Sequence, residues 1–517
     1  MFLIIFFTIL LIIIIHYVYN FNKIPKESGN IPYVSGLPLM WALIRQKPHD
    51  EVEEIMSKTS GDHEIYLVEQ ILTFFFLMKK NYVYDFYVVN YRNCRGPATK
   101  LAAGATRFGP FKQINFVSPE CVKDLLMASE DVAPKIEFHP GSVFYDFFGK
   151  GLPFSNGDLW KTYRKLATPA FNSTLRTDMI GETTMELFTF MEKNLSGPTD
   201  IFILLQRITI EILGKMAFGH QFNCLKSLEI PHMINVYKYI ISFVESPLRI
   251  IFPFINKLPL ESNKKFLAAI KEFDNFIYEI IEKKKDEMNN NKINNKENSS
   301  DLLTKMLEYS KQEGINTDNK QLRDEMVNNF VAGHDTTAVA LTVSLYYLAK
   351  YPEIQERARS EVINILGDKL TIPTSEQLKG IHPPTTLINL RKPSKPIKVG
   401  SYVVPKDNLC IANIWQIHHN PKYWENPNQY NPDRFLINEK SHPFSWIPFS
   451  AGHRNCIGQN FSLMEQRVIL SMFLLKYEWT LPKDSINKEK LILESQFLLR
   501  PVNIELLFTE KEFVYQN

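Results

Sequence analysis

The stretch Phe449-Ser-Ala-Gly452-His-Arg454-Asn-Cys456-Ile-Gly458, close to the C-terminus, decides both the fold and the chemistry that this sequence predicts. A cysteine thiolate is a soft, electron-rich ligand that can hold a haem iron and push electron density towards bound oxygen. Gly452 and Gly458 would let the backbone approach the sulfur closely, and Arg454 can pair with a haem carboxylate. The alternative is a buried structural cysteine beside a helix, which is the usual environment of a single cysteine.

The residues after this loop predict a helix. Apolar side chains recur there at helical spacing, at Phe461, Met464, Val468, Met472 and Leu475. Cys456 is therefore expected at a helix N-terminus, where the positive end of the helix dipole favours the deprotonated thiol.

Length, charge and cysteine usage exclude several classes of protein. A chain of 517 residues with 45% apolar residues can form one large domain or two to three ordinary ones. Its formal net charge of +3 is too small to predict nucleic acid as a partner. The five cysteines are odd in number and scattered, which argues for a reducing compartment and against a disulfide framework. His453 and Cys456 have no second Cys/His pair at zinc-ligand spacing, which argues against a zinc site.

The N-terminus predicts a membrane anchor. No Asp, Glu, Lys or Arg occurs from Met1 to Tyr19, and a helix of ~19 residues matches the thickness of the bilayer hydrocarbon. We expect a single transmembrane anchor over residues 1–22. Lys23 and Lys26 follow it, so the positive-inside rule places the rest of the chain in the cytoplasm. A cleaved signal peptide is the alternative, but a basic start and a small-residue cleavage site are missing.

The remaining pattern is mostly helical. A proline-rich linker and a first helix are expected over residues 23–60. Longer helices are expected over residues 177–195, 200–218, 259–285 and 321–350. Strand pairs are expected over residues 395–415, with turns at 400 and 406–408, and over residues 497–508. The Asn/Lys-rich tract 289–300 is expected to be an exposed loop. These elements predict a mainly α fold with small β-sheets.

Two further motifs carry polar groups on helices. The expected helix over residues 321–350 has Ala332-Gly333-His334-Asp335-Thr336-Thr337 at its middle, although Gly, Asp and Thr are poor helix formers. A glycine there would leave room for a small ligand, and Asp335 and Thr336 could deliver protons to bound oxygen. The alternative is a polar helix kink. Trp160 and Arg164 lie four residues apart, so one helical face can offer an indole N–H and a guanidinium to an anion.

These motifs and their order resemble the cytochrome P450 family, of the membrane-anchored eukaryotic type. The resemblance implies the cytochrome P450 fold, with one large haem-binding domain over residues 108–517. It also implies haem b, with Cys456 as the axial thiolate ligand of the iron and Phe449 at the start of the haem loop. The positions that contact the haem propionates in the family are matched by Trp160, Arg164, Arg391 and Arg454. Ala332, Gly333, Asp335 and Thr336 match the oxygen-binding groove and its acid–alcohol pair.

The family pattern is interrupted in two places. The Glu-x-x-Arg helix is apparently missing, since Gln377-Leu-Lys-Gly380 is followed almost directly by His382-Pro383-Pro384, an apparent deletion near residues 380–382. Arg434, which in the family pairs with that helix, is therefore expected to be buried without its carboxylate. Glu356 and Arg359 have the same spacing, but they are expected on a solvated charged face. The aromatic-rich segment 61–107 also departs from the pattern.

The resemblance implies a haem-thiolate monooxygenase at the endoplasmic reticulum membrane, with O2 and an apolar small molecule as substrates and NADPH-cytochrome P450 reductase as electron donor. The lining of the substrate site is expected from residues 131–154, Val331 and residues 497–499. Two alternatives remain open. A catalytically impaired relic would explain both interruptions. A haem-thiolate isomerase or dehydratase acting on peroxides would need neither a reductase nor the Asp335–Thr336 pair.

Overall fold

The computed structural model describes residues 103–511, except 109–110, 174, 247–248, 250–252, 291–300, 316, 374–388, 428, 436–441 and 496–498. The predicted anchor 1–22, the linker 23–60, residues 61–102, most of the Asn/Lys-rich tract and the interruption near 380–382 lie outside these residues. Within the described part of the chain, no helix is both long enough and apolar enough to cross a bilayer.

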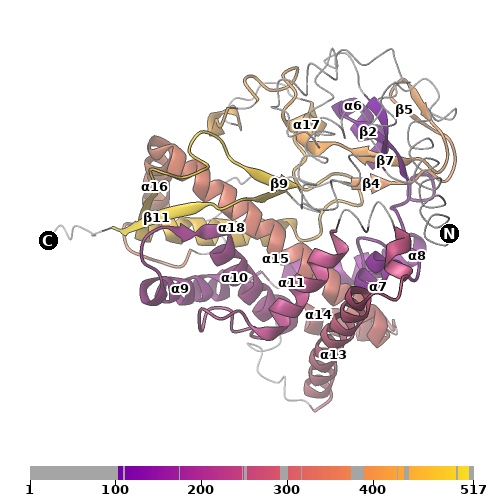
Figure 1. Ribbon diagram of the computed structural model, residues 1–517, viewed down its shortest axis with the longest axis horizontal. Coiled ribbons are helices and arrows are strands. Elements are labelled where there is room, and N and C mark those ends of the chain that lie inside the picture. The colour runs from indigo at the N-terminus through magenta and orange to yellow at the C-terminus, as the bar shows by residue number, and fades with distance from the viewer. Residues whose placement is uncertain are drawn as a thin grey trace, which may run out of the picture.

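Helices make up most of the described chain (Figure 1). The first half contains α6 (Pro119–Met127), α7 (Val143–Phe148), α8 (Gly157–Ser173), α9 (Thr177–Asn194), α10 (Ile201–Leu213), the π-helix η4 (Gly214–Phe218) and α11 (His232–Val244). The second half contains η5 (Pro253–Lys257), α13 (Glu261–Asn289), α14 (Leu302–Gln312), α15 (Asn319–Lys350), α16 (Pro352–Leu366), α17 (Ile414–His418), η7 (Pro432–Phe435), η8 (Pro443–Ser445) and α18 (Gln459–Lys476).

The strands form small sheets. One sheet has the order β1-β2-β7-β4 and is built from β1 (Ala103–Phe108), β2 (Phe111–Phe116), β7 (Leu409–Ala412) and β4 (Asn389–Arg391). Its β2–β7 pair is parallel and its other pairs are antiparallel. A second has the order β3-β11-β8, built from β3 (Thr199–Asp200), β11 (Glu505–Glu510) and β8 (Tyr477–Thr480). Two hairpins pair β5 (Ile397–Val399) with β6 (Tyr402–Val404), and β9 (Leu493–Ser495) with β10 (Leu499–Pro501).

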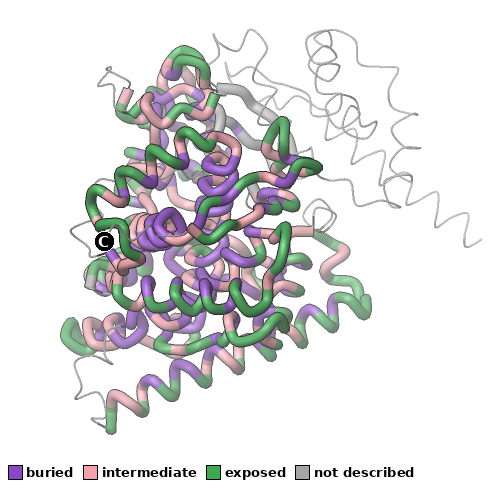
Figure 2. Tube along the Cα trace, turned by 90° about the vertical axis from the view of Figure 1, so that its left-hand side faces the viewer, coloured by how far each residue is buried: buried purple, intermediate pink, exposed green. Residues whose placement is uncertain are grey.

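The core is organised around α15, which runs through the middle of the helical part (Figure 1). It packs against α10, α13, α16 and α18. Its burial is high along the whole length, so it lacks the exposed face of a surface helix. Figure 2 shows the same arrangement, with buried residues along the inner faces of the helices and exposed residues outside. This placement brings the polar middle of α15 into the interior.

Most of the expected elements are confirmed, and one strand pairing is wrong. Helices α9, α10 with η4, α13 and α15 cover the four expected ranges, and the β5–β6 hairpin turns at Gly400, whose φ is +58°. Strand β10 lies within residues 497–508 and β11 begins within them, but the two strands do not pair with each other. The amide of Asn487 donates to the carbonyls of Val502 and Asn503 between them, at 2.9 and 3.0 Å. That corner directs the two strands into different sheets.

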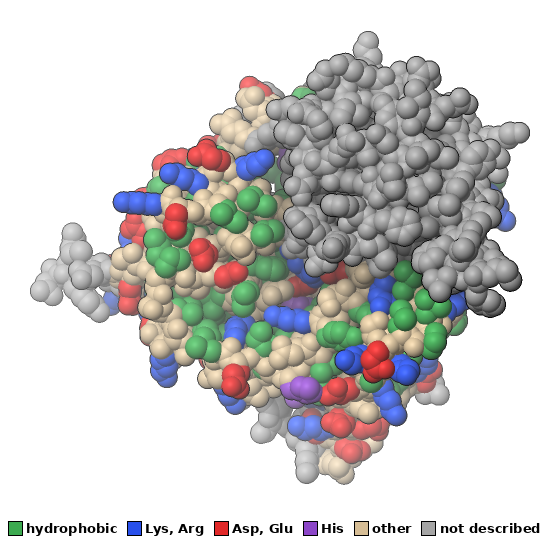
Figure 3. Space-filling model, viewed as in Figure 1, with side chains coloured by type: hydrophobic (Ala, Val, Ile, Leu, Met, Phe, Trp, Pro, Cys, Tyr) green, Lys and Arg blue, Asp and Glu red, His purple; other side chains and the backbone are tan. Residues whose placement is uncertain are grey.

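The described surface is mixed in charge. On the face shown in Figure 3, outside the grey atoms, basic and acidic side chains lie interspersed with hydrophobic ones. This agrees with the small net charge of +3. A strongly basic face, which nucleic-acid binding would require, is not seen on the described part of this view.

Candidate functional site

The Cys456 loop is a compact turn fixed by its own backbone. The Cys456 N–H donates to the Phe449 carbonyl at 3.0 Å, and the Asn455 N–H donates to the Gly452 carbonyl at 3.1 Å. Gly452 has a φ of +76°, and a Cβ added there would lie 2.6 Å from the Leu126 carbonyl oxygen at the end of α6. Gly452 is therefore required by its conformation and by close packing on α6.

Cys456 lies just before α18, whose N-cap is Gly458, so the expected place at a helix N-terminus is confirmed. The expected preference for the thiolate is not found in the protein alone. Burial raises the pKa of the Cys456 thiol, and this outweighs the lowering by the Gly458 backbone and the Arg164 guanidinium. The helix end and the arginine are present, but the loss of solvent is the larger effect. A bound cation would have to favour the deprotonated sulfur.

Helix α8 brings Trp160 and Arg164 to this loop. The Arg164 guanidinium donates to the backbone carbonyl of Asn455 at 2.9 Å and to its side-chain oxygen at 2.8 Å. The Trp160 ring lies 4.4 Å from the guanidinium carbon of Arg454 and 5.8 Å from the ring of His453. The two residues predicted to share a helical face therefore both contact the loop that carries Cys456.

Arg391, at the end of β4, has buried N–H groups that donate to no described residue. Its side chain is 1% exposed, and none of its three guanidinium nitrogens has a hydrogen-bond partner among the described residues. Burial lowers the pKa of Arg391 to about 10, and Glu130 opposes this. A buried cation without partners is unfavourable unless an anion reaches it. The arrangement therefore fits an anionic ligand in this space.

Arg454 lies in the same buried region. It donates to the Ser155 carbonyl at 2.6 Å and pairs with Glu130 at 3.0 Å. Burial lowers the pKa of Arg454 to about 10, with Glu130 opposing it. Lys135 lies opposite Arg391 in a β-bridge, and its pKa is lowered well below the ordinary value by burial and then by the two arginines. Arg391, Arg454 and Lys135, here called the cation cluster, thus face one acidic side chain among the described residues. Burial disfavours the charged form of Lys135, but the two arginines alone outnumber Glu130, and this excess of positive charge suits the carboxylates of a haem.

The middle of α15 has one open face. Ala332 is exposed within this core helix, and the Thr336 hydroxyl on the same face donates to the Ala332 carbonyl at 2.8 Å. Gly333 does not provide that room. A Cβ added at Gly333 would lie 2.8 Å from a methyl group of Leu213, so this glycine allows close packing of α15 on α10. The space for a small ligand is at Ala332, one residue earlier than expected.

A side-chain contact joins the two predicted motifs. The hydroxyls of Thr337 on α15 and Ser462 on α18 lie 2.9 Å apart in the interior. Gln466 donates to the same Ser462 hydroxyl at 2.9 Å. The polar segment of α15 therefore packs on the helix that begins directly after the Cys456 loop.

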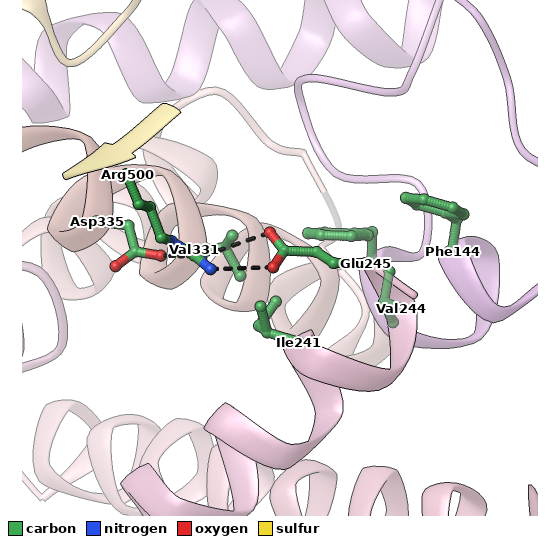
Figure 4. Close-up of a pocket in the computed structure, with 8 residues that line it drawn as sticks. Phe144, Ile241, Val244, Glu245, Val331, Asp335 and Arg500 are labelled. Atoms are coloured by element: carbon green, nitrogen blue, oxygen red, sulfur yellow. Dashed lines mark hydrogen bonds and ion pairs between the residues drawn. The ribbon is translucent and has the colours of Figure 1, made fainter. Parts of the chain in front are cut away.

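Asp335 is held in an ion-pair network (Figure 4). Arg500 of β10 contacts Asp335 at 2.7 Å and Glu245, at the end of α11, at 3.0 Å. The Gln206 amide donates to Asp335 at 2.7 Å. Burial alone would raise the pKa of Asp335, but His334, Arg500 and the hydrogen bond from Gln206 leave the pKa below its ordinary value. Asp335 is thus an ionised, fully engaged carboxylate in this conformation.

A small pocket with mainly apolar walls lies beside this network. Figure 4 shows its apolar walls facing the Arg500 ion pairs. The apolar lining comes from Phe144, Phe148, Ile241, Val244 and Val331. Two of the three regions expected to line a substrate site, residues 131–154 and Val331, contribute to it. Such a lining favours apolar ligand surface over polar surface, because burying apolar surface is favourable.

Two expectations about charged residues are wrong. Arg434 is not buried without partners: it is half-buried and donates to the carbonyls of Asn431, Asn426 and Gln429. Arg359 is not on a solvated face, since it is 1% exposed and contacts Glu356 at 3.1 Å. Backbone carbonyls accept the hydrogen bonds of the Arg434 guanidinium, and the packing of α16 buries Arg359.

Several site residues were not identified from the sequence. Five such residues reach the site from separate segments: Glu130, Lys135, Gln206, Glu245 and Arg500. The charge pattern of each segment is ordinary, so no local signal distinguishes these residues. Arg500 falls in the range expected to form the last strand pair, one residue beyond the expected substrate lining 497–499, and its pairing with Asp335 spans 165 residues of sequence.

Comparisons with known proteins agree with this geometry. The family profile described as "Cytochrome P450" matches residues 86–508, so the match begins within the segment 61–107. The chain is 30% identical over 416 residues to "Cytochrome P450 4F6" of Rattus norvegicus, covering 74% of this chain and 76% of that protein. It is 28% identical over 385 residues to "Cytokinin hydroxylase" of Arabidopsis thaliana, covering 71% and 73%.

Among solved structures, the crystal structure of the cytochrome P450DA heme domain matches with a TM-score of 0.70 at 19% identity. The match covers 83% of this chain and 92% of that one. At this identity the likeness shows the fold.

Proposed function

The chain belongs to the cytochrome P450 family, and from this premise we propose that it is a haem-thiolate monooxygenase that inserts one oxygen atom of O2 into an apolar small molecule. The finer parts of this proposal are the electron donor, the substrate class and the residue roles. NADPH-cytochrome P450 reductase is proposed as the donor, with the anchor 1–22 holding the catalytic domain on the cytoplasmic side of the endoplasmic reticulum membrane.

One observation carries the proposal: buried Arg391, whose donors lack partners among the described residues, lies in a cation cluster beside the Cys456 loop. Haem, when bound, supplies the binding and activation of molecular oxygen. Cys456 would bind its iron through the thiolate, while Arg391 and Arg454 would bind its carboxylates. Trp160 would pack beside Arg454 and donate its indole N–H. Phe449 would hold the loop closed through its carbonyl, which accepts from the Cys456 N–H.

On α15, Ala332 and Thr336 would border the space for oxygen. The Thr336 hydroxyl can pass on a proton if it exchanges its bond to the Ala332 carbonyl for one to the ligand. Asp335 is ionised and bound by Arg500, so it can supply a proton only after it is protonated and that contact rearranges. The apolar side chains around the pocket would contact the substrate and exclude water from this region.

The test is the absorption spectrum of the full chain expressed with haem supply, reduced under carbon monoxide. Wild-type protein is expected to show a thiolate-type band, and Cys456→Ser is expected to lose it. Cys224→Ser is the matched control, because Cys224 is a buried cysteine packed in another part of the core. A band that survives Cys456→Ser would overturn the assignment. Folded wild-type protein that carries no haem would favour the impaired relic.

A further inference from the structure

Glu130 is held rigidly in a turn after α6. The backbone N–H groups of Val132 and Ala133 both donate to the Ser129 carbonyl, at 3.0 and 2.9 Å. The Ser394 N–H, just beyond β4, donates to the Val132 carbonyl at 3.0 Å. The turn is therefore tied to the same strand exit that carries Arg391. These bonds fix the backbone from which the Glu130 side chain extends.

Its carboxylate reaches into that cluster. One oxygen lies 3.0 Å from a terminal guanidinium nitrogen of Arg454, with side-chain exposures of 12% for Glu130 and 2% for Arg454. Neither carboxylate oxygen of Glu130 makes a hydrogen bond to the described residues. The contact with Arg454 is therefore an ion pair without hydrogen-bond geometry. An ionised carboxylate can accept about four hydrogen bonds. Arg391, nearby, has donors to spare.

An acidic side chain is unexpected here. The cation cluster suits an anionic ligand, and a carboxylate within it weakens anion binding by repulsion. Packing alone does not explain the choice, since an apolar residue of similar size would fill the same volume without repulsion. The charge of Glu130 therefore has consequences for the ligand. Negative charge near a metal stabilises its more oxidised state, which lowers the reduction potential.

We propose that Glu130 is a positioning residue for the haem: it holds Arg454 in place and sets the charge around the cofactor carboxylates, which lowers the reduction potential of the iron. This inference rests on the proposed function. Arg454 is then shared between a protein carboxylate and a cofactor carboxylate, and Arg391 provides the donors that the protein leaves unused.

The first test is the midpoint potential of the purified holoprotein with the isosteric substitution Glu130→Gln. Removal of the buried charge is expected to shift the potential to a more positive value. Asp131→Asn is the matched control, because Asp131 is the next residue and is exposed, so its charge is screened by water. Glu130→Asp keeps the charge but withdraws it by one methylene group, and a smaller positive shift is expected. If both Glu130 variants retain the wild-type potential, the proposal is wrong.

The second test separates charge from structure. In haem-free protein, Glu130→Gln is expected to lower the melting temperature, because Arg454 loses its partner. Titration with hemin is expected to show tighter binding by the same variant, because the repulsion is gone. A residue with only a structural role would weaken both. Hemin binding that is weaker than in wild-type protein therefore overturns the proposal. If wild-type protein binds no hemin at all, the proposed function fails, and this outcome is seen before any variant is compared.

Discussion

The two charged regions of the site differ in how their charges are balanced. Around Asp335, a single arginine bridges two carboxylates and an amide completes the network, so each buried charge has a partner in the protein. Around Arg391, the arginines outnumber Glu130, and within the described ranges some buried guanidinium N–H groups have no hydrogen-bond partner. Both regions are buried, so burial alone does not distinguish them.

The difference separates a self-sufficient network from an incomplete one. A buried charge whose partners lie within the protein contributes to folding, and removing one partner is strongly destabilising. A buried charge without a partner destabilises the folded, ligand-free protein. Binding of a ligand that pairs with this charge removes that penalty. We therefore propose the incomplete region as the ligand site. Removing an arginine from each of the two regions should then change the free energy of unfolding of the haem-free protein in opposite directions.

The largest expected effect is in the balanced network. Arg500→Met leaves Asp335 and Glu245 buried without their cation, which should lower the free energy of unfolding by about 3–5 kcal/mol. Urea unfolding of haem-free protein near neutral pH measures this. The double variant with Asp335→Asn should recover part of the loss, since one unpaired carboxylate is then removed. A loss below about 1 kcal/mol would mean that the network is solvated, contrary to its burial.

Arg391→Met should have the opposite sign in haem-free protein. Replacing an unpartnered buried cation with an apolar side chain is expected to raise the free energy of unfolding, within the range of about 1–4 kcal/mol seen for such replacements. Hemin binding should weaken by about tenfold to a hundredfold, since one charged hydrogen-bonding partner is lost. Thermal unfolding with and without hemin measures both. If Arg391→Met destabilises the haem-free protein as Arg500→Met does, the contrast between the two regions is lost.

Two glycines, one in the Cys456 loop and one on α15, differ in what requires a glycine: the backbone conformation at Gly452, and only side-chain packing at Gly333. Gly452→Ala should cost about 2 kcal/mol or more, because its φ is +76° and the new methyl group would meet a backbone oxygen at 2.6 Å. Gly333→Ala should change stability by less than about 1 kcal/mol, because the gain in helix propensity offsets the contact with the flexible end of Leu213. Chemical unfolding of the two variants checks this. Equal costs would contradict the view that only the loop glycine is fixed by its conformation.

The sequence was sufficient where the chemistry is local. The spacing of Trp160 and Arg164, the loop around Cys456 and the polar middle of α15 all depend on residues a few positions apart, and each lies where it was expected. The pattern could not reveal that β10 and β11 belong to different sheets, because alternation identifies a strand but not its partner. It also could not reveal that Arg500 pairs with Asp335, or that Gly333 faces Leu213, because these contacts depend on how distant elements pack.

The smallest expected effect concerns Glu465, a buried carboxyl that, unlike Asp335, has no cationic partner among the residues that the structure describes. Glu465 on α18 is 1% exposed, and neither of its oxygens has a hydrogen-bond partner among the described residues. Burial raises the pKa of Glu465 well above its ordinary value, whereas the pKa of Asp335 is lowered. Glu465 therefore binds its proton more tightly in the folded state. Its contribution to stability is complete below the ordinary pKa and is lost as the pH rises towards the folded pKa.

Asp335 acts in the opposite direction, since its contribution is present above its ordinary pKa and is lost as the pH falls through the lowered one. In the wild-type protein, Glu465 should reduce the free energy of unfolding by up to about 1.4 kcal/mol for each pH unit above its ordinary pKa. Glu465→Gln should remove this slope, while Asp335→Asn should leave it in place. Urea unfolding at several pH values measures this slope. The useful pH range is about 5 to 8, because it lies above the ordinary pKa of a glutamate. A slope that persists in Glu465→Gln would assign it to another group, and the two buried carboxyls would then not differ as their surroundings require.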